Sequence, residues 1–291
     1  MSKKNKVQKR RTKGQMIWYQ FKKNKAAVFG MCFLILLILV TIWAQFHYDY
    51  DKDVSATSTD VLAWPSAEHP LGTDHLGRDM LARLLYGGRW SLSIGLGVVC
   101  LNTMAGILYG AIATYIGGTV ETLMMRFIEA IMMIPGMLMV IVLVGVFGVS
   151  TVNLVLAMSI GGIPYQARLT RSVMMPLRNA DYVEAARAIG VPTWKIILKH
   201  ILPNCSSSLI VSFTMRCGGS IMSVGTYSFL GLGVPKPMPE WGTMLSDVRG
   251  FMKQRPDLVF YPGMLILLVT LSCNLMGDGL RDALDPKLRS K

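Results

Sequence analysis

The chain has 291 residues, of which 52% are hydrophobic and 16% charged, and its formal net charge is +13. Soluble domains average about a quarter charged residues, so this composition excludes an ordinary soluble protein. A basic excess can indicate nucleic-acid binding. Here, however, it is concentrated in residues 1–25, directly before a long apolar segment, so we predict no nucleic-acid partner.

Six long apolar segments follow one another along the chain, near residues 27–46, 90–115, 127–147, 151–170, 205–230 and 258–277. A helix needs about 20 apolar residues to cross the core of a bilayer. Buried helices of soluble proteins rarely contain uncharged stretches of this length. The sequence therefore predicts an all-α polytopic membrane protein with six transmembrane helices.

The first segment, 26–46, resembles a signal peptide in its position, because residues 1–25 contain ten Lys and Arg residues and no acid. Its apolar core is too long, however, and the following FHYDYDKD (46–53) has no small-residue cleavage site. We predict that 26–46 is retained as the first transmembrane anchor helix, after a basic cytoplasmic N-terminus.

The basic residues also predict the orientation of the chain. With the N-terminus inside, six crossings place 116–126, 171–204 and 278–291 inside as well. Counting Arg168 at the inner end of the fourth segment, 21 of the 30 Lys and Arg residues lie on this side. The large loops 47–89 and 231–257 hold only four each. This distribution follows the positive-inside rule and predicts both termini in the cytoplasm. The same basic face should attract anionic membrane lipid.

The extracytoplasmic loop 47–89 contains one region with helical spacing, 76–85. Asp79 and Arg83 are four residues apart there, as in an ion pair on one helix face. We predict an amphipathic helix that lies at the outer interface before the second crossing.

No metal or disulfide framework is predicted. His69, Asp74 and His75 lie close in sequence, but their spacing fits no standard pattern of metal ligands. The five cysteines form no CxxC pair and lie in or beside apolar segments, where they are expected to act as small packing residues; they are Cys32, Cys100, Cys205, Cys217 and Cys273.

The third segment, 127–147, has two local features. Pro135 lies inside it and should kink the helix, because proline removes a backbone hydrogen bond and clashes with the preceding turn. Arg126 and Glu129 are three residues apart at its cytoplasmic end, where we expect an ion pair.

Motifs for bond chemistry are absent from the sequence. There is no GxxxxGK[ST] phosphate loop, so the chain is not expected to hydrolyse ATP, and HExxH and GxSxG are also missing. Apart from Glu129 near one boundary, Asp and Glu are absent from the six segments, whereas coupled carriers usually need intramembrane acids. These absences indicate a non-catalytic membrane protein and disfavour a secondary carrier or channel, which stays a less favoured alternative.

The stretch 181–204 is charged and helix-prone, and it lies between two apolar segments on the cytoplasmic side. Asp181 can cap a first helix, with Glu184 three residues later at the spacing of a capping box. Gly190 and then Pro192 should end this helix.

A second helix is predicted to start after Thr193 and to end at Pro203. Its apolar residues recur at helical spacing and are expected to share one face; they are Trp194, Ile197, Leu198 and Ile201. From spacing alone, this helix pair is either a docking surface for another protein or an ordinary capped loop.

Glu184-Ala185-Ala186, followed by Gly190 and by HILP at 200–203, resembles the EAA loop of ABC importer permeases. His200 stands where the general pattern has isoleucine, a variant familiar in the peptide-importer branch. The resemblance implies that this loop forms a coupling helix that docks in a groove of an ATPase subunit. It implies that Glu184, Ala185, Ala186 and Gly190 carry the docking.

Four further blocks are similar to the C-type permease subunit of dipeptide, oligopeptide and nickel importers. They are WYQFKKNKAAVFG (18–30), HPLGTDHLGRDMLARLLYGGR (69–89), YSFLGLGVPKPMPEWGTML (227–245) and NLMGDGLRDALDP (274–286). The resemblance covers nearly the whole chain. It implies a type I ABC importer permease fold in the bacterial plasma membrane, with residues 90–280 as its transmembrane domain and 281–291 as a cytoplasmic C-terminus.

The resemblance also implies partners for this chain. These are a second permease subunit, two ABC ATPase subunits that use ATP and Mg²⁺, and an extracytoplasmic peptide-binding protein. ATP binding would close the ATPase pair, and the coupling helices would then switch the permease pair from inward-open to outward-open.

Arg216 lies near the centre of the fifth segment, where members of this family usually have an uncharged residue. A charged arginine at the bilayer midplane costs at least about 2.5–3.5 kcal/mol, so it should face a polar cavity or a partner. One hypothesis is that Arg216 contacts the substrate, as a partner for a peptide carboxylate. The alternatives are pairing with the second permease subunit or with backbone carbonyls.

Substrate choice has two alternatives within the same family. The first is a di- or oligopeptide, and the second is nickel or another metal chelate. A His-rich or acid-rich path would favour a metal, and the predicted path-lining segments have neither.

Overall fold

The computed structural model describes residues 12–285, and within this range it consists of helices and loops, without a β-strand. The helices, in chain order, are α1 (Lys13–Lys23), α2 (Lys25–His47), α3 (Met80–Ile116), α4 (Gly118–Met132), α5 (Gly136–Phe147), α6 (Thr151–Arg178), α7 (Asp181–Ala188), α8 (Thr193–Ile196), α9 (Leu202–Phe229), α10 (Trp241–Val248) and α11 (Asp257–Leu284). Two π turns, η1 (Tyr50–Val54) and η2 (Ile197–Ile201), and a 3₁₀ turn, η3 (Arg249–Phe251), complete the order. The predicted all-α class is confirmed.

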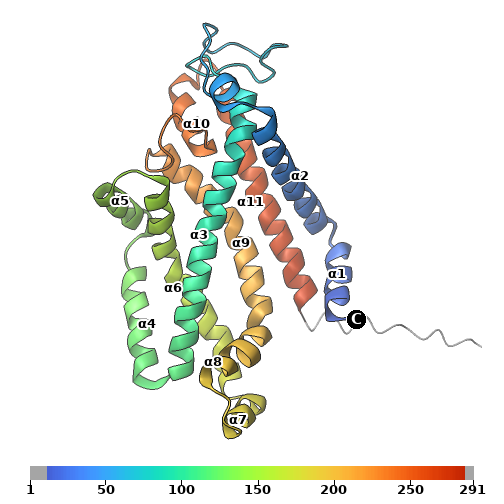
Figure 1. Cartoon of the computed structure of the whole chain (residues 1–291), viewed down its shortest axis with the longest axis vertical. Helices are drawn as coiled ribbons and strands as arrows, with labels where there is room; N and C mark the ends of the chain where they lie inside the picture. Colours follow the sequence, from blue (N-terminus) through green and yellow to red (C-terminus); the bar gives the residue numbers. More distant parts are fainter. Residues whose placement is uncertain (1–11, 286–291) are drawn as a thin grey trace, which may run out of the picture.

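The long helices run alongside one another (Figure 1). α6 packs along α3, α9 packs against α3 and α11, and α2 leans on α11. The loop 48–79 and α10 lie at one end, and α7, α1 and the α3–α4 junction lie toward the other. The α3–α4 junction, α7 and the segment that contains α1 were predicted on one side of the membrane, and this arrangement agrees with that grouping.

The predicted count of six spans is not reproduced. Within 12–285, four helical stretches are long and apolar enough to cross a membrane: Lys25–His47, Met80–Ile116, Thr193–Phe229 and Asp257–Leu284. The bent pair α4–α5 makes a fifth if it counts as one span. α6 is long enough, with 28 residues, but Asn153, Gln166 and Arg168 interrupt its apolar sequence. Gln166 is fully buried in α6, which packs along α3.

The predicted kink at Pro135 is confirmed and is sharp. α4 ends at Met132 and α5 begins at Gly136 with Pro135 as its N-cap residue, and the two helices are bent by 82°. Because Pro135 has no N–H and restricts the residue before it, the chain leaves the helical path at this point.

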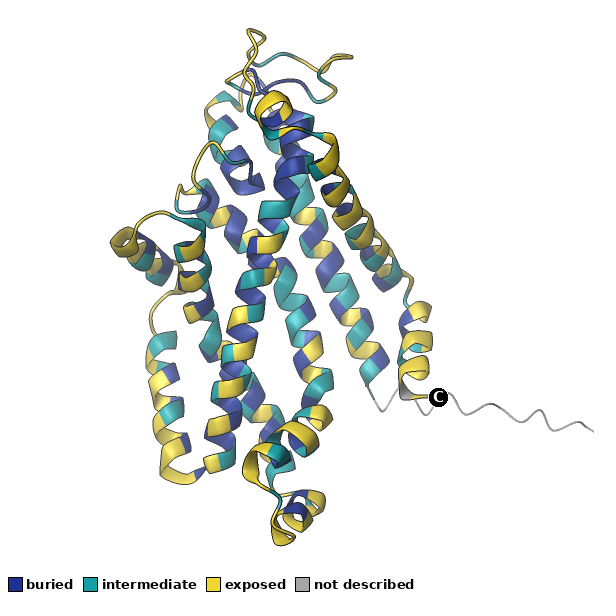
Figure 2. Cartoon of the chain, viewed as in Figure 1, coloured by how far each residue is buried: buried dark blue, intermediate teal, exposed yellow. Residues whose placement is uncertain are grey.

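The surface of the helix bundle is strongly apolar. Only 17% of the apolar stretch of α2 is buried, and exposed residues line the outer sides of α2 and α4 (Figure 2). The large exposed side chains of α2 are Phe29, Ile35, Leu36, Ile38, Leu39, Ile42, Trp43 and Phe46. An apolar surface of this extent is expected for helices surrounded by lipid or by other membrane subunits.

Glycines let the central helices approach closely. A Cβ atom on Gly110 of α3 would lie 2.5 Å from the carbonyl oxygen of Ala167 on α6, and one on Gly218 of α9 would lie 2.9 Å from that of Thr270 on α11. Small residues at such contacts allow backbone-to-backbone packing, which drives helix association in membranes.

The outer loop differs from its prediction. The segment 76–85 does not form a separate interfacial helix, because α3 starts at Met80 and continues to Ile116. Asp79 is the N-cap residue of α3, and its carboxylate accepts a hydrogen bond from the backbone of Ala82 and lies 2.8 Å from His69 Nδ1. The predicted Asp79–Arg83 pair is therefore wrong. The predicted Arg126–Glu129 pair is confirmed, with 3.0 Å between Nη1 and Oε2.

Candidate functional site

The helix of the charged stretch forms as α7, with one error in its predicted start. Ala180, rather than Asp181, is the N-cap residue, and no side chain caps the helix. Asp181 and Glu184 both lie in the first turn, where carboxylates interact favourably with the positive end of the helix dipole. The two acids therefore stabilise this end through their charge and leave their oxygens exposed.

The predicted stop at Gly190 is confirmed by its backbone. Gly190 has a φ of +78°, in the left-handed region that suits glycine. Its N–H donates to the carbonyl of Arg187, and the N–H of Val191 donates to that of Ala186. These two bonds form a Schellman motif, which satisfies the last carbonyls of α7 and turns the chain.

The four predicted docking residues separate into two groups. Ala186 is buried, as is Val183, and both pack against Met174 of α6 and Ile196 of α8. Glu184, Ala185 and Gly190 are exposed. α7 lies at the far end of the molecule from the outer loop (Figure 1). Its inner side is thus fixed to the bundle, and its outer side is free to contact another protein.

The second helix of the stretch differs from its prediction. Ile196 and Ile201 are its fully buried residues, whereas Trp194 and Leu198 are more than half exposed. The buried positions are five residues apart because 197–201 form the π turn η2, in which the N–H of Leu202 donates to the carbonyl of Ile197. The expected shared face of Trp194, Ile197, Leu198 and Ile201 is therefore wrong.

Pro203 does not end this helix. α8, η2 and α9 form one stretch from Thr193 to Phe229. A proline removes one backbone donor and crowds the preceding turn, and the wider π turn directly before Pro203 accommodates both effects. As a result, the segment beside α7 continues directly into α9, the long helix that carries Arg216.

Arg216 lies between two cavities, as expected for a charged residue that needs a polar environment. A cavity of about 540 Å³ is lined by Arg216, Arg281, Asp285, apolar side chains and three serines of α9, Ser207, Ser208 and Ser212. A second cavity, of about 390 Å³, is also lined by Arg216 and otherwise mainly by residues of α3, α6 and α9. Arg216 Nη2 donates to the carbonyl oxygen of Gly162 on α6, at 3.3 Å. Of the predicted partners of Arg216, a backbone carbonyl is therefore present, and it accepts one of the guanidinium N–H groups.

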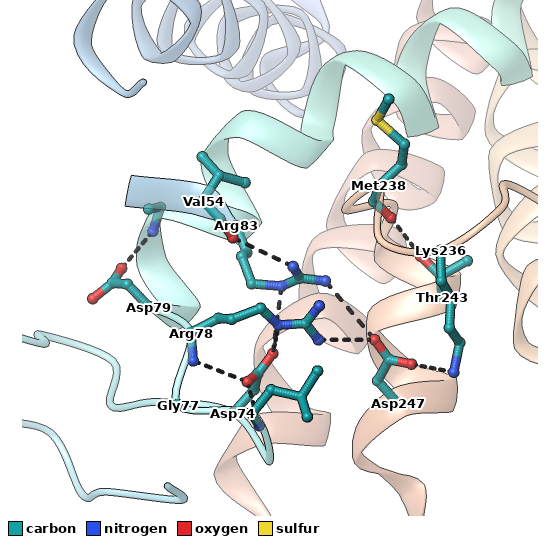
Figure 3. Close-up of polar contacts among 12 residues, drawn as sticks. Val54, Asp74, Gly77, Arg78, Asp79, Arg83, Lys236, Met238, Thr243 and Asp247 are labelled. Carbon is teal, nitrogen blue, oxygen red and sulfur yellow. Dashed lines mark hydrogen bonds and ion pairs between the residues drawn. The ribbon is translucent and has the colours of Figure 1, made fainter. Parts of the chain in front are cut away.

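A buried ion network at the outer end of the bundle was missed by the sequence analysis (Figure 3). Asp74 Oδ2 lies 2.7 Å from Arg78 Nε and 3.5 Å from Arg83 Nε. Asp247 of α10 lies 3.2 Å from Arg78 Nη2 and 2.6 Å from Lys236 Nζ. We call Asp74, Arg78, Arg83 and Asp247 the outer ion network. It joins the loop 48–79 to α3 and α10, and the only sequence signal for it was the clustering of charges in 74–83.

A second missed cluster lies at the opposite end, where α4 meets α6. Glu121 is mostly buried and lies 2.6 Å from Arg171 Nε and 3.8 Å from Arg178 Nη1. Arg178 is the last residue of α6, three positions before α7 begins. This cluster therefore ties α4 to the end of α6 from which the docking segment projects.

Among the described residues, no group of three or more His, Cys, Asp or Glu side chains could hold a metal ion. His69 pairs with Asp79, and Asp74 belongs to the outer ion network. All five cysteines are free thiols.

Comparisons with known proteins place this geometry in a family. Residues 103–290 match the family model described as "Binding-protein-dependent transport system inner membrane component". Residues 12–65 match the "N-terminal TM domain of oligopeptide transport permease C". The two matches together cover most of the chain.

Curated relatives are similar over almost their full lengths. The chain is 41% identical to the glutathione transport system permease protein GsiD of Pectobacterium atrosepticum, with 96% of this chain and 93% of that protein covered. It is 40% identical to the dipeptide transport system permease protein DppC of Haemophilus influenzae, with 94% and 95% covered.

A solved structure agrees at the level of the fold. A chain from the inward-facing MetNI methionine ABC transporter superposes with a TM-score of 0.59 at 15% identity, and the match covers 71% of this chain and 98% of that one. The chain therefore belongs to the family of binding-protein-dependent transport system inner-membrane components, the permease subunits of ABC importers.

Proposed function

We propose that this chain, with a second permease subunit, forms the translocation path for di- and oligopeptides in an ABC importer. The names of its relatives support this substrate class, since they are dipeptide and glutathione permeases. The path itself is supported by two cavities that share Arg216 of α9.

The exposed side of α7 is the observation that carries the coupling role. Val183 and Ala186 fix the helix to the bundle, while Glu184, Ala185 and Gly190 face outward. Small side chains at an exposed helix surface allow close approach of a partner groove. Because the neighbouring helix continues into α9, a displacement of α7 can be transmitted to the cavities around Arg216.

The chain is proposed to perform no catalysis of its own. Two partner ATPase subunits bind Mg²⁺ and hydrolyse ATP, and an extracytoplasmic binding protein delivers the peptide. Residues 90–280 serve as the transmembrane domain, with 1–25 and 281–291 in the cytoplasm of a bacterium. The grouping of basic segments supports this orientation.

Reconstitution tests the proposed function. The chain would be placed in proteoliposomes with its second permease and its ATPases, and the binding protein would be added outside. ATP-dependent uptake of labelled trialanine is the expected result. Uptake of a nickel chelate without uptake of any peptide would show that the substrate is a metal chelate. Uptake in the absence of the ATPase subunits would show that the chain is not part of an ATP-driven importer.

Gly190→Asn distinguishes two roles of Gly190, the ending of α7 and the docking of the ATPase subunit. Asparagine tolerates the left-handed backbone of this position, so α7 should still end here. A Cβ atom on Gly190 meets no atom within 4 Å in this chain, so the added side chain is harmless to the permease alone. We expect normal membrane insertion and stability but reduced co-purification of the ATPase subunit. Unchanged co-purification would mean that Gly190 serves only to end the helix.

We also propose that Arg216 contacts the transported peptide. Its guanidinium lines both cavities and forms one hydrogen bond to protein within the described residues, so further N–H groups are free to bind a ligand. A charge-assisted bond to a carboxylate is roughly twice as strong as a neutral one.

Arg216→Gln tests this contact. The change keeps a hydrogen-bond donor but removes the charge, so the uptake of free-acid peptides should fall more than that of C-terminally amidated peptides. The expected loss is about tenfold or more, since hydrogen bonds to charged groups contribute about 1.5–3 kcal/mol. Equal losses for both kinds of peptide, or no loss, would exclude the carboxylate contact.

A further inference from the structure

The cavity of about 390 Å³ brings together polar groups from three helices. Asn102 of α3, Tyr165 of α6, and Ser223 and Tyr227 of α9 line it together with Arg216. None of its lining residues is Asp or Glu. The charge of Arg216 therefore has no acidic neighbour in this cavity, and an anion that enters would meet an uncompensated positive charge.

Asn102 is a mostly buried polar residue of α3 whose amide N–H group has no hydrogen-bond partner in the part of the chain that the structure describes. It is only 3% exposed, and its Oδ1 accepts a hydrogen bond from Thr103 Oγ1. Its Nδ2 group forms no hydrogen bond with any residue in the described range 12–285. Because Asn102 lines the cavity together with Arg216, this donor is available to an acceptor group that enters the cavity.

Gly162 shows that the Asn102 amide and the Arg216 guanidinium converge. A Cβ atom on Gly162 would lie 2.6 Å from Asn102 Nδ2 and 3.0 Å from Arg216 Nη2. Both donor groups therefore flank the same point on α6, where the absence of a side chain lets them approach the helix closely. An amide and a guanidinium that meet in this way present several N–H donors to one acceptor group.

We propose that Asn102 and Arg216 together form a carboxylate subsite above Gly162, and that Asn102 is a specificity-determining residue for the transported molecule. The inference rests on the proposed peptide-import function and names the group of the peptide that this cavity selects. The carboxylate can be the C-terminus of the peptide or an acidic side chain, because both present the same two oxygens.

Asn102→Asp tests the subsite in the complete transporter, reconstituted in proteoliposomes with the binding protein saturated by peptide. The aspartate has nearly the same shape but repels a carboxylate and neutralises Arg216. We expect trialanine uptake to fall at least about tenfold relative to trialanine amide. Ala-Glu-Ala amide distinguishes the two carboxylates: it should behave like trialanine if an acidic side chain is accepted, and like trialanine amide if only the C-terminus is.

Asn24→Asp is the matched control. Asn24 caps α2 through its Oδ1 atom, and aspartate caps a helix equally well, so the same charge is added far from the cavity. This variant should keep the preference of the unsubstituted transporter. The binding protein is the same in all comparisons, so its own preference cancels when each variant is compared with the parent.

Gly162→Ala provides a second variant that leaves the charge unchanged. The three atoms nearest to the added methyl group, at 2.6–3.0 Å, belong to the side-chain ends of Asn102 and Arg216, so the methyl group should displace these donors. The same loss of preference for trialanine is expected. The subsite is excluded if Asn102→Asp and Gly162→Ala slow trialanine and its amide equally or leave both unchanged. No ATP-dependent trialanine uptake by the unsubstituted transporter would instead contradict the proposed function itself.

Discussion

Ala185→Arg should abolish association with the ATPase subunit while the permease still folds and inserts into the membrane. Ala185 is exposed on α7, so the arginine can be accommodated in the isolated chain. In a docked complex the same charge would be buried without a partner, at a cost of several kcal/mol. A penalty of about 3 kcal/mol weakens binding more than a hundredfold. Co-purification of the ATPase and ATP-dependent peptide uptake are the measurements.

Ser172→Arg is the control for this substitution. It adds the same side chain at an exposed position of α6 near its α7 end, outside α7, and should leave the association intact. If the Ala185→Arg transporter still binds its ATPase, the outer side of α7 is not the docking surface.

Ala186 should respond differently from its neighbour because it faces inward. It is 6% exposed and packs with Val183 against the bundle, so an arginine there should detach α7 as well as disrupt docking. Limited proteolysis of the isolated permease in detergent would then cleave near α7 in Ala186→Arg but not in Ala185→Arg.

Asp247→Asn should destabilise the outer end of the protein strongly. The side chains of Asp247, Arg78 and Arg83 are at most 6% exposed, and the substitution leaves the two arginines with Asp74 alone. Breaking a buried ion pair costs about 3–5 kcal/mol, because an uncompensated charge is left behind. At roughly 2–4 °C per kcal/mol for a chain of 150–250 residues, the apparent unfolding temperature in detergent should fall by about 6 °C or more.

Lys236→Gln is the matched control, because it removes the other partner of the same carboxylate. The Lys236 side chain is 67% exposed, and exposed ion pairs contribute about 0–1 kcal/mol. We expect little change in its unfolding temperature. Equal shifts in the two variants would show that the outer ion network does not hold the loop 48–79 in place.

The local sequence predicted a structural feature correctly where neighbouring residues in the chain cause that feature. Pro135 breaks its helix, Gly190 ends α7, and Arg126 pairs with Glu129, and each effect involves residues within about one turn of one another. The errors arose where a second element intervenes. The Asp79–Arg83 pair fails because Asp79 caps α3 and faces His69, while Arg83 is drawn to Asp74 and Asp247.

By itself the sequence determined that the protein is helical and built for a membrane, where its apolar segments lie, and which segment resembles a docking loop. Composition and short-range spacing contain this information, because they decide helix formation and burial in lipid. Which residues of α7 face outward was decided only by the packing of Val183 and Ala186 on α6 and α8. The same holds for the meeting of Asn102 and Arg216 at Gly162, since it joins three helices that are far apart in the chain. Contacts of this kind depend on how helices pack in three dimensions, and spacing along one chain does not contain that packing.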